Sequence, residues 1–312
     1  MNRIRSDRGQ ATVLTVIFLV ALLGAAALVL DVGSWFREQR DTQGAADAAA
    51  LAAAQALPDS PAQAEVLAAS YVAKNRGGEL TTTYGSKNLA NDTVTVEVER
   101  SAPGIFAKLF GIDSVQVDAR ASARVGGLDQ AKWVAPIVVN IKHPKLNCGT
   151  ANGKPVPCFG QPTKLDLHHL HQPGSGDAAG SFGLINLDID SGGNTGASTV
   201  ASWMENGFDE YMGLGAYHAV PSSNFNNGQF KSALKIRLGD DLLFPIYKKI
   251  TGSGQNAKYD VAGWVGFNVT SFHAGGSSGE VHGSFTKVIW EGIQSASGDN
   301  ANWGALAIEL VE

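Results

Sequence analysis

The chain has 312 residues, of which 17% are charged and 37 are glycine, a composition that favours strands and tight turns over a helical bundle. Its formal net charge of −5 gives no support for nucleic acid or an anionic lipid surface as a partner. About 250 residues follow the N-terminal apolar segment and its helical extension, enough for one large or two small cores.

An uninterrupted apolar run extends from Ala11 to Leu30 and contains no charged residue, Pro, Asn or His. A helix of that length spans roughly 30 Å, the thickness of a bilayer core. The sequence therefore predicts a cytoplasmic tail over residues 1–10 and a transmembrane helix over residues 11–30. The lipid bilayer is the predicted partner of this helix.

The charges that flank the run predict its orientation. Arg3, Arg5 and Arg8 precede it with one acid, Asp7, whereas acids and bases are mixed after it. Positive residues prefer the cytoplasmic side, so we expect the N-terminus inside and the rest outside. Without the three arginines and Asp7, the remaining 21 basic and 28 acidic residues give the exported part a charge of −7.

A cleaved signal peptide is the alternative interpretation of this segment. Ala25, Ala26 and Ala27 provide a small-residue A-x-A site after an apolar run. The length of the run and the helical pattern that continues past Asp31 favour a retained anchor.

Residues 31–57 are rich in alanine, the strongest helix former, so they should extend the anchor as one long helix that Pro58 and Pro61 end. A stripe of small residues lies four apart on one face: Gly44, Ala48, Ala52 and Ala56. Such a stripe lets another helix approach closely. It is either a docking surface or the face that packs on the protein's own domain.

A small α+β unit is predicted to complete the domain of residues 31–127. Its expected elements are a helix over 61–76, a strand over 93–100, a short apolar helix over 103–110 and a strand over 114–125. Val94, Val96 and Val98 alternate with polar residues, the period of a half-buried strand. Gly126 and Gly127 mark the expected end of the unit.

Residues 128–312 are predicted to form an exported, mainly antiparallel β domain, a sandwich or a barrel. Gly, Ser and Asn turns separate short apolar segments at 133–141, 181–189, 233–239, 241–250, 259–269, 283–290 and 305–311. One helix is expected within this domain, over residues 199–212. The fold class is therefore α+β, with a transmembrane helix, an Ala-rich helix, a small α+β unit and a β domain.

Cys148 and Cys158 are the two cysteines, and an even count in an exported domain favours a disulfide. The nine intervening residues include two glycines and two prolines, so the chain can turn back on itself. There is no C-x-x-C spacing and hence no redox motif. Two independent thiols are the alternative.

The run LDLHHLHQ is the best metal-site candidate in the sequence, although we predict no metal. His169 and His171 would share one strand face, while Asp166 alternates onto the face of His168. The two imidazoles and the carboxylate therefore do not converge in a strand, and surface or loop histidines are the simpler interpretation.

Three other patterns suggest a site only weakly, and no catalytic or cofactor-binding residue is predicted. Asp188, Asp190 and Asn194 resemble part of a calcium loop that lacks its closing Glu. The run 275–279 matches G-x-S-x-G around Ser277, but that motif needs a strand before it and a helix after it. Four tryptophans provide either a carbohydrate platform or core packing: Trp203, Trp264, Trp290 and Trp303.

The first 57 residues resemble the N-terminal module of TadG-like Flp pilus-assembly proteins of bacteria. The matching elements are Arg8-Gly9-Gln10-Ala11, Asp31-x-Gly33, Gln43 and the alanine run of residues 46–54. This resemblance implies an inner-membrane protein that assembles or anchors a thin adhesive pilus, with pilus-assembly or envelope proteins, or a second copy, as partners.

Two features depart from related families. Pilin-like relatives have a Glu five residues after a cleaved Gly, where this chain has Leu14. The D-x-S-x-S metal signature of some full-length members is not matched by the run 188–192. We therefore expect a non-enzymatic envelope protein; an anchored metal-dependent or serine hydrolase and a carbohydrate-binding module are the alternatives.

Overall fold

The computed structural model describes residues 8–151, 154–168, 181–190, 195–253, 256–275, 278–296 and 303–311. The chain divides into two compact units, residues 1–124 with 310–312 (unit 1) and residues 125–309 (unit 2). The predicted α+β class, with a long N-terminal helix and a β-rich C-terminal part, is confirmed.

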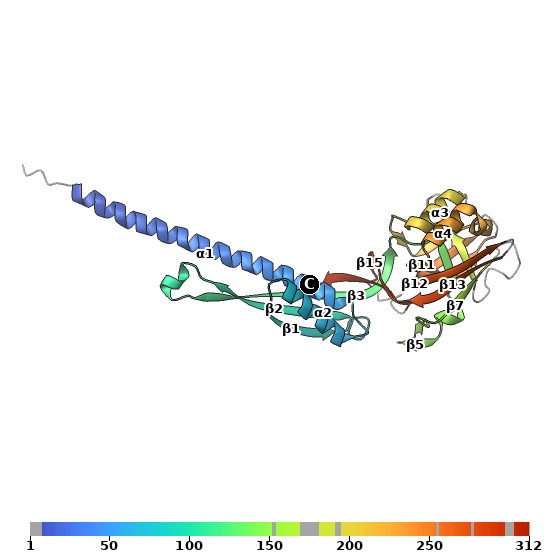
Figure 1. Cartoon of the computed structure of the whole chain (residues 1–312), viewed down its shortest axis with the longest axis horizontal. Coiled ribbons are helices and arrows are strands. Elements are labelled where there is room, and N and C mark those ends of the chain that lie inside the picture. Colours follow the sequence, from blue (N-terminus) through green and yellow to red (C-terminus); the bar gives the residue numbers. More distant parts are fainter. Residues whose placement is uncertain are drawn as a thin grey trace, which may run out of the picture. The chain divides into compact units, whose positions relative to one another are not determined.

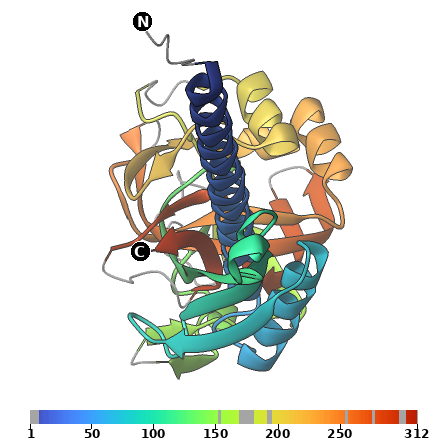
Figure 2. The ribbon, with the colours of Figure 1, turned by 90° about the vertical axis from the view of Figure 1, so that its left-hand side faces the viewer.

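Unit 1 combines two helices with an antiparallel meander. Its elements are α1 (Arg8–Ala54), α2 (Pro61–Lys74), β1 (Glu79–Gly85), β2 (Thr93–Pro103), the 3-10 helix η1 (Ala107–Phe110) and the first part of β3 (Ser114–Ala131). β2 pairs with β1 on one side and with β3 on the other. Figure 1 shows the C-terminal part of α1 running along this sheet, with α2 beside it. Figure 2 shows α1 as one unbroken helix.

The core of unit 1 is built from small side chains. Val94, Val96 and Val98 alternate with more polar, less buried residues on β2, and all three are fully buried. The part of α1 that packs in this unit contributes these buried alanines: Ala45, Ala46, Ala49, Ala50, Ala52, Ala53 and Ala54. Because alanine ends at Cβ, helix and sheet can pack closely here without costing helix propensity.

Three details of unit 1 differ from the sequence prediction. α1 ends at Ala54 rather than Leu57, and Ser60 then caps α2 by accepting a hydrogen bond from the Gln63 N–H. The predicted helix over 103–110 is only the short turn η1, because β2 extends to Pro103. The strand β1 was not predicted, since its threonine-rich sequence does not alternate between apolar and polar residues.

Unit 2 is a β domain with two short helices on it. Its elements are β4 (Ile137–Asn140), η2 (Pro144–Leu146), β5 (Gly149–Ala151), β6 (Lys154–Val156), β7 (Thr163–Leu167), β8 (Ser181–Ile185), α3 (Ala197–Asn206), β9 (Met212–Gly213), β10 (Gly215–Val220), η3 (Ser222–Asn226), α4 (Gly228–Ile236), β11 (Asp241–Thr251), β12 (Lys258–Gly275), β13 (Ser278–Thr286), β14 (Val288–Ile289), β15 (Gly292–Gln294) and β16 (Ala305–Val311). α3 and α4 lie side by side in both ribbon views (Figures 1 and 2).

The main sheet of unit 2 closes on itself. Its order is β10-β12-β11-β4-β8-β7-β13, and β12 also pairs with β13 while β10 also pairs with β8. Most neighbours are antiparallel, whereas β4 with β11 and β7 with β8 are parallel. Of the predicted alternatives, the barrel describes this closed sheet better than the sandwich does.

The central strands of unit 2 are buried on both faces. On β4, Ile137 and Val139 belong to one hydrophobic cluster and Val138 to another. The first cluster also holds buried side chains of α3 and α4, among them Met204 and Phe230. Strands with two buried faces lack polar alternation, which explains the continuous apolar runs in their sequences.

One predicted strand-like segment of unit 2 is a helix. Residues 233–239 overlap α4, whose buried side chains Phe230, Ala233 and Leu234 follow helical spacing. Asn227 caps this helix by accepting from the Gln229 N–H. The helix expected over 199–212 is shorter and earlier, Ala197–Asn206, because Gly207 with φ 79° ends it.

Candidate membrane interface

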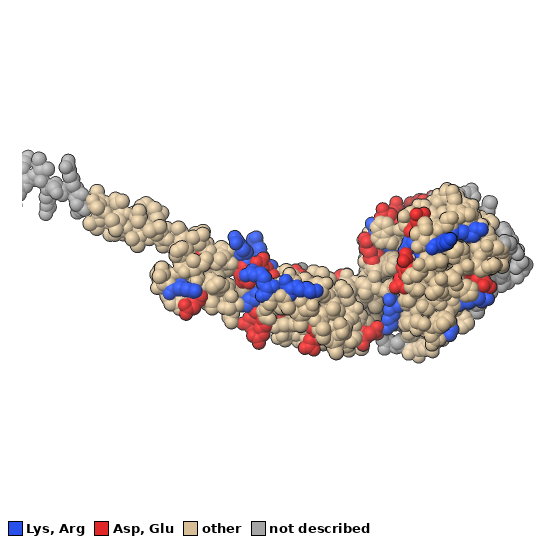
Figure 3. Space-filling view, viewed as in Figure 1, with Lys and Arg blue, Asp and Glu red and all other residues tan. Residues whose placement is uncertain are grey.

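Residues 11–30 of α1, here called the apolar half, are almost entirely exposed. The most apolar window of this helix has a mean hydropathy of 2.9, and none of that window is buried. Figure 3 shows no charged atoms along this stretch. The helix is long and apolar enough to cross a membrane, a test that a signal sequence near the N-terminus also passes. Lipid can cover such a surface, whereas water cannot do so favourably.

Asp31 follows the apolar half at once and is buried, although the preceding residue, Leu30, is exposed. Its carboxylate accepts hydrogen bonds from three consecutive backbone N–H groups, of Ile105 (2.7 Å), Phe106 (3.0 Å) and Ala107 (2.5 Å). One turn later, the Trp35 indole donates to the Pro103 carbonyl at 3.3 Å. The connection between β2 and β3 is thereby fixed to α1 where the apolar half ends.

Residues 31–54, here called the packed half, hold the predicted small-residue stripe. Ala52 is buried within unit 1 and Ala48 is half-buried. Gly44 is exposed, and a methyl group added at its Cα would meet no atom within 4 Å. Ala56 lies in the turn after α1. The stripe therefore runs from the interior of unit 1 at Ala52 to open surface at Gly44.

Ion pairs join the packed half to the rest of unit 1. Glu38 of α1 pairs with Arg76 at 3.1 Å and with Arg100 of β2 at 3.6 Å. Arg100 is buried and also donates to the Gly77 carbonyl at 2.7 Å. Because Arg76 follows α2, this one carboxylate connects α1 to both α2 and the sheet.

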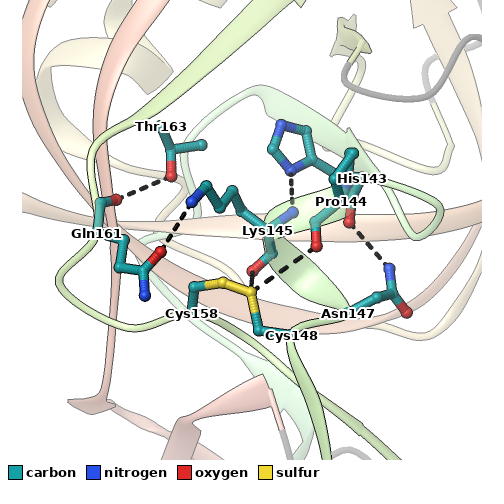
Figure 4. The surroundings of a disulfide bond; sticks show 8 residues. All are labelled: His143, Pro144, Lys145, Asn147, Cys148, Cys158, Gln161 and Thr163. Atoms are coloured by element: carbon teal, nitrogen blue, oxygen red, sulfur yellow. Dashed lines mark hydrogen bonds between the residues drawn. A yellow bond between two sulfur atoms is a disulfide. The ribbon is translucent and has the colours of Figure 1, made fainter.

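The predicted disulfide is present in unit 2. Cys148 and Cys158 are bonded, with 5.3 Å between their Cα atoms (Figure 4). The Cys158 N–H donates to the Lys145 carbonyl at 2.8 Å, and the Lys145 ammonium donates to Gln161 at 2.7 Å. The bond closes the loop that contains the β5–β6 hairpin, which is a structural role.

The metal candidates Asp166 and His168 do not converge. Asp166 is exposed, and its carboxylate pairs at 2.8 Å with a lysine two residues earlier. His168 is buried, with its Nε2 2.6 Å from the Tyr259 hydroxyl, whose pKa burial raises well above the ordinary value. His169 and His171 lie outside the described residues. Within the described part of the chain, no three metal-ligating side chains come together.

The other two weak motifs lie in turns. Asp188 accepts from the Asp190 N–H at 2.9 Å, as in a polar turn after a strand, and Asn194 lies outside the described residues. The G-x-S-x-G run connects the strands β12 and β13, so no helix follows it as a nucleophile elbow requires. Ser277 itself also lies outside the described residues.

The four tryptophans contribute mainly to packing. Trp264 is fully buried, and Trp203, Trp290 and Trp303 are partly buried against the two hydrophobic clusters. The Trp290 indole also donates to the Lys132 carbonyl at 2.7 Å. This arrangement corresponds to the core-packing interpretation of these residues.

Sequence reasoning missed the role of Asp31 and the exposure of the β2–β3 connection. The signal was present in the run IFAKLFGI, residues 105–112, a strongly apolar turn of unit 1. The sequence predicted only a short apolar helix over residues 103–110, and it did not indicate that most of the large apolar side chains in this run are exposed.

Residues 9–56 match the Tad family model, Flp pilus-assembly TadE/G-like. No curated protein and no solved structure matches the chain. The match covers both halves of α1 and ends two residues after the helix does. The N-terminal helix is therefore a TadE/G-like module, as predicted from the same residues, and together with its apolar half it indicates a single-pass membrane protein.

Proposed function

We propose that this chain, which begins with a TadE/G-like module, is a structural or assembly component of a Flp/Tad-type pilus or a related secretion or adhesion system. Residues 1–10 lie in the cytoplasm, residues 11–30 cross the bacterial inner membrane, and residues 31–127 and 128–312 work on the outer side. The protein acts through contacts with other envelope proteins or with a second copy, and not through catalysis.

One observation carries this proposal: a single helix has an apolar half that no other described residue covers and a packed half whose alanines contribute to the core of unit 1. The anchor and part of the core of unit 1 therefore belong to one continuous helix. The arginines before the anchor support the orientation.

The first test is carbonate extraction and protease shaving of cells that express the full chain. We expect the protein to stay in the membrane pellet and residues beyond 31 to be digested from outside. Recovery only as a soluble species without residues 1–30, or protection of unit 2 from the protease, would overturn the anchor or its orientation.

The second test is photo-crosslinking in native membranes, with the crosslinker placed at exposed Gly44 and, as a matched control, at buried Ala53. We expect adducts with pilus-assembly or envelope proteins from position 44 and none from position 53. Adducts from neither position, in cells that assemble the pilus, would contradict a role through contacts on this face.

A further inference from the structure

The β2–β3 connection, residues 104–112 and here called the apolar tip, exposes large apolar side chains to an unusual degree. Leu109 and Phe110 are 82% and 81% exposed, and Ile105 is 58% exposed. Elsewhere on β2 and β3 the valines and alanines lie on the buried face, and most polar residues, with the exception of Arg100, lie on the other face. The exposure is thus local to the tip.

The apolar tip is a built structure rather than a loose loop. The Gly104 N–H donates to the Asp113 carbonyl at 2.9 Å and the Ile112 N–H to the Ala107 carbonyl at 3.1 Å. Gly111 has a φ of 81°, which favours glycine and turns the chain back toward β3. These bonds close the tip and hold Leu109 and Phe110 on its outer side.

The polar loop between β1 and β2, residues 86–92, provides an internal comparison. Asp92 accepts from the N–H groups of Lys87, Asn88 and Leu89 at 2.6–2.9 Å, much as Asp31 does for the apolar tip. Both connections are therefore ordered by one buried aspartate. The polar loop contains serine, lysine, asparagines, alanine and one half-buried leucine, so the fold itself does not require exposed Leu and Phe.

The two connections lie at opposite ends of the meander, because β1, β2 and β3 are successive antiparallel strands. The apolar tip is the one bound to Asp31, which directly follows the apolar half of α1. One residue corresponds to a rise of about 1.5 Å, so Asp31 marks the edge of the bilayer core. The tip is therefore held at the level where α1 leaves the lipid.

We propose that the apolar tip is a second membrane contact, which inserts Leu109, Phe110 and Ile105 into the interface of the leaflet that α1 exits. This inference rests on the proposed membrane anchor. Lys108 within the tip keeps its ammonium at the headgroups while its stem lies along apolar surface. Asp31 acts as a positioning residue: it sets the height of the tip and makes the anchor and unit 1 one rigid body on the membrane.

The test uses the full chain in vesicles of phosphatidylcholine with one-fifth phosphatidylglycerol. The native cysteines are joined in a disulfide, so one introduced cysteine can carry an environment-sensitive fluorophore. The labelled variants are Leu109→Cys in the apolar tip, Ala90→Cys in the polar loop and Val20→Cys in the apolar half. Quenching is measured with lipids that carry a spin label near the headgroup or deep in the acyl chain.

We expect the label at 109 to be quenched by shallow lipids, the label at 20 by deep lipids, and the label at 90 by neither. Quenching at 20 without quenching at 109 overturns the second contact and leaves the anchor intact. Absence of quenching at 20 overturns the anchor itself. If the label at 109 reports an apolar environment only at high protein density, a second copy of the chain covers the apolar tip, which also overturns the proposal.

Asp31→Ala tests the positioning role. We expect amide exchange at Ile105, Phe106 and Ala107 to rise about tenfold or more and shallow quenching at 109 to fall, while Asp92→Ala leaves both unchanged. Asp31→Glu should restore part of the protection. Unchanged exchange at these three amides in Asp31→Ala contradicts the role of this carboxylate.

Discussion

Residues 11–30 and residues 45–54 belong to one unbroken helix, yet they differ in side-chain size and in surroundings. The apolar half carries Val, Leu, Ile and Phe side chains that are exposed, whereas the buried positions of residues 45–54 are all alanine. Lipid accepts large apolar side chains at no packing cost, while a sheet at close range accepts only small ones. Side-chain volume along the helix therefore indicates which part faces lipid and which part packs against the sheet.

The largest effect is expected from charges in the apolar half. Val16→Arg with Val20→Arg should cost roughly 5–7 kcal/mol of membrane insertion, because each arginine at the centre of a span costs about 2.5–3.5 kcal/mol. The fraction resistant to carbonate extraction measures this. Trypsin resistance of residues 31–124 should not change, since positions 16 and 20 are exposed and lie outside that part. A loss of that resistance would contradict the separation of the two halves.

A size increase in the packed half should have the next largest effect. Ala53 is fully buried, so Ala53→Leu forces extra volume between α1 and its neighbours and should lower the free energy of unfolding by about 1–3 kcal/mol. Denaturant titration of the detergent-solubilised chain, followed by amide exchange in β2, measures it. The matched control is Ala21→Leu in the apolar half, which should leave the free energy of unfolding unchanged. Equal effects at both positions would show that the two halves of α1 do not differ in packing.

Much of this comparison was accessible from the sequence. Composition alone identified residues 11–30 as apolar, and the alternating valines at 94, 96 and 98 identified β2. What could not be predicted depends on contacts distant in sequence. Asp31 meets its backbone partners more than seventy residues later, and no local pattern reports such a contact. Residues 233–239 were interpreted wrongly because a short apolar run fits a strand and a helix equally well.

Acid should destabilise the packed part of unit 1 without changing the membrane insertion of the apolar half. Burial opposes ionisation of Asp92, but the N–H groups of Leu89, Asn88 and Lys87 outweigh it and hold its pKa below the ordinary 3.8. A lowered pKa in the folded state means that this stabilisation is complete above pH 3.8 and is lost as pH falls through the lowered value. The apolar half has no ionisable group, so its insertion should not change.

The acid prediction is checked by amide exchange in β1 and β2 across pH, corrected for intrinsic rates, together with extraction from vesicles. Asp92→Asn should lower the free energy of unfolding by about 1 kcal/mol at neutral pH, because an amide oxygen replaces a carboxylate as acceptor. The free energy of unfolding of this variant should also fall less as the pH is lowered. If the free energy of unfolding of Asp92→Asn fell at acid pH as much as that of the native chain, the pH dependence would belong to other carboxylates.

The smallest effect is expected at Gly44, and its sign is opposite to that at Ala53. A side chain at position 44 meets no atom of the protein within 4 Å, so Gly44→Leu should raise the free energy of unfolding by about 0.5–1 kcal/mol through helix propensity alone. The same denaturant titration measures it. If this face binds a partner helix, leucine also blocks its close approach. The yield of crosslinked partner should then fall while the free energy of unfolding rises. Stability and recovery that change in the same direction would show that Gly44 serves the unit's own packing and not a docking surface.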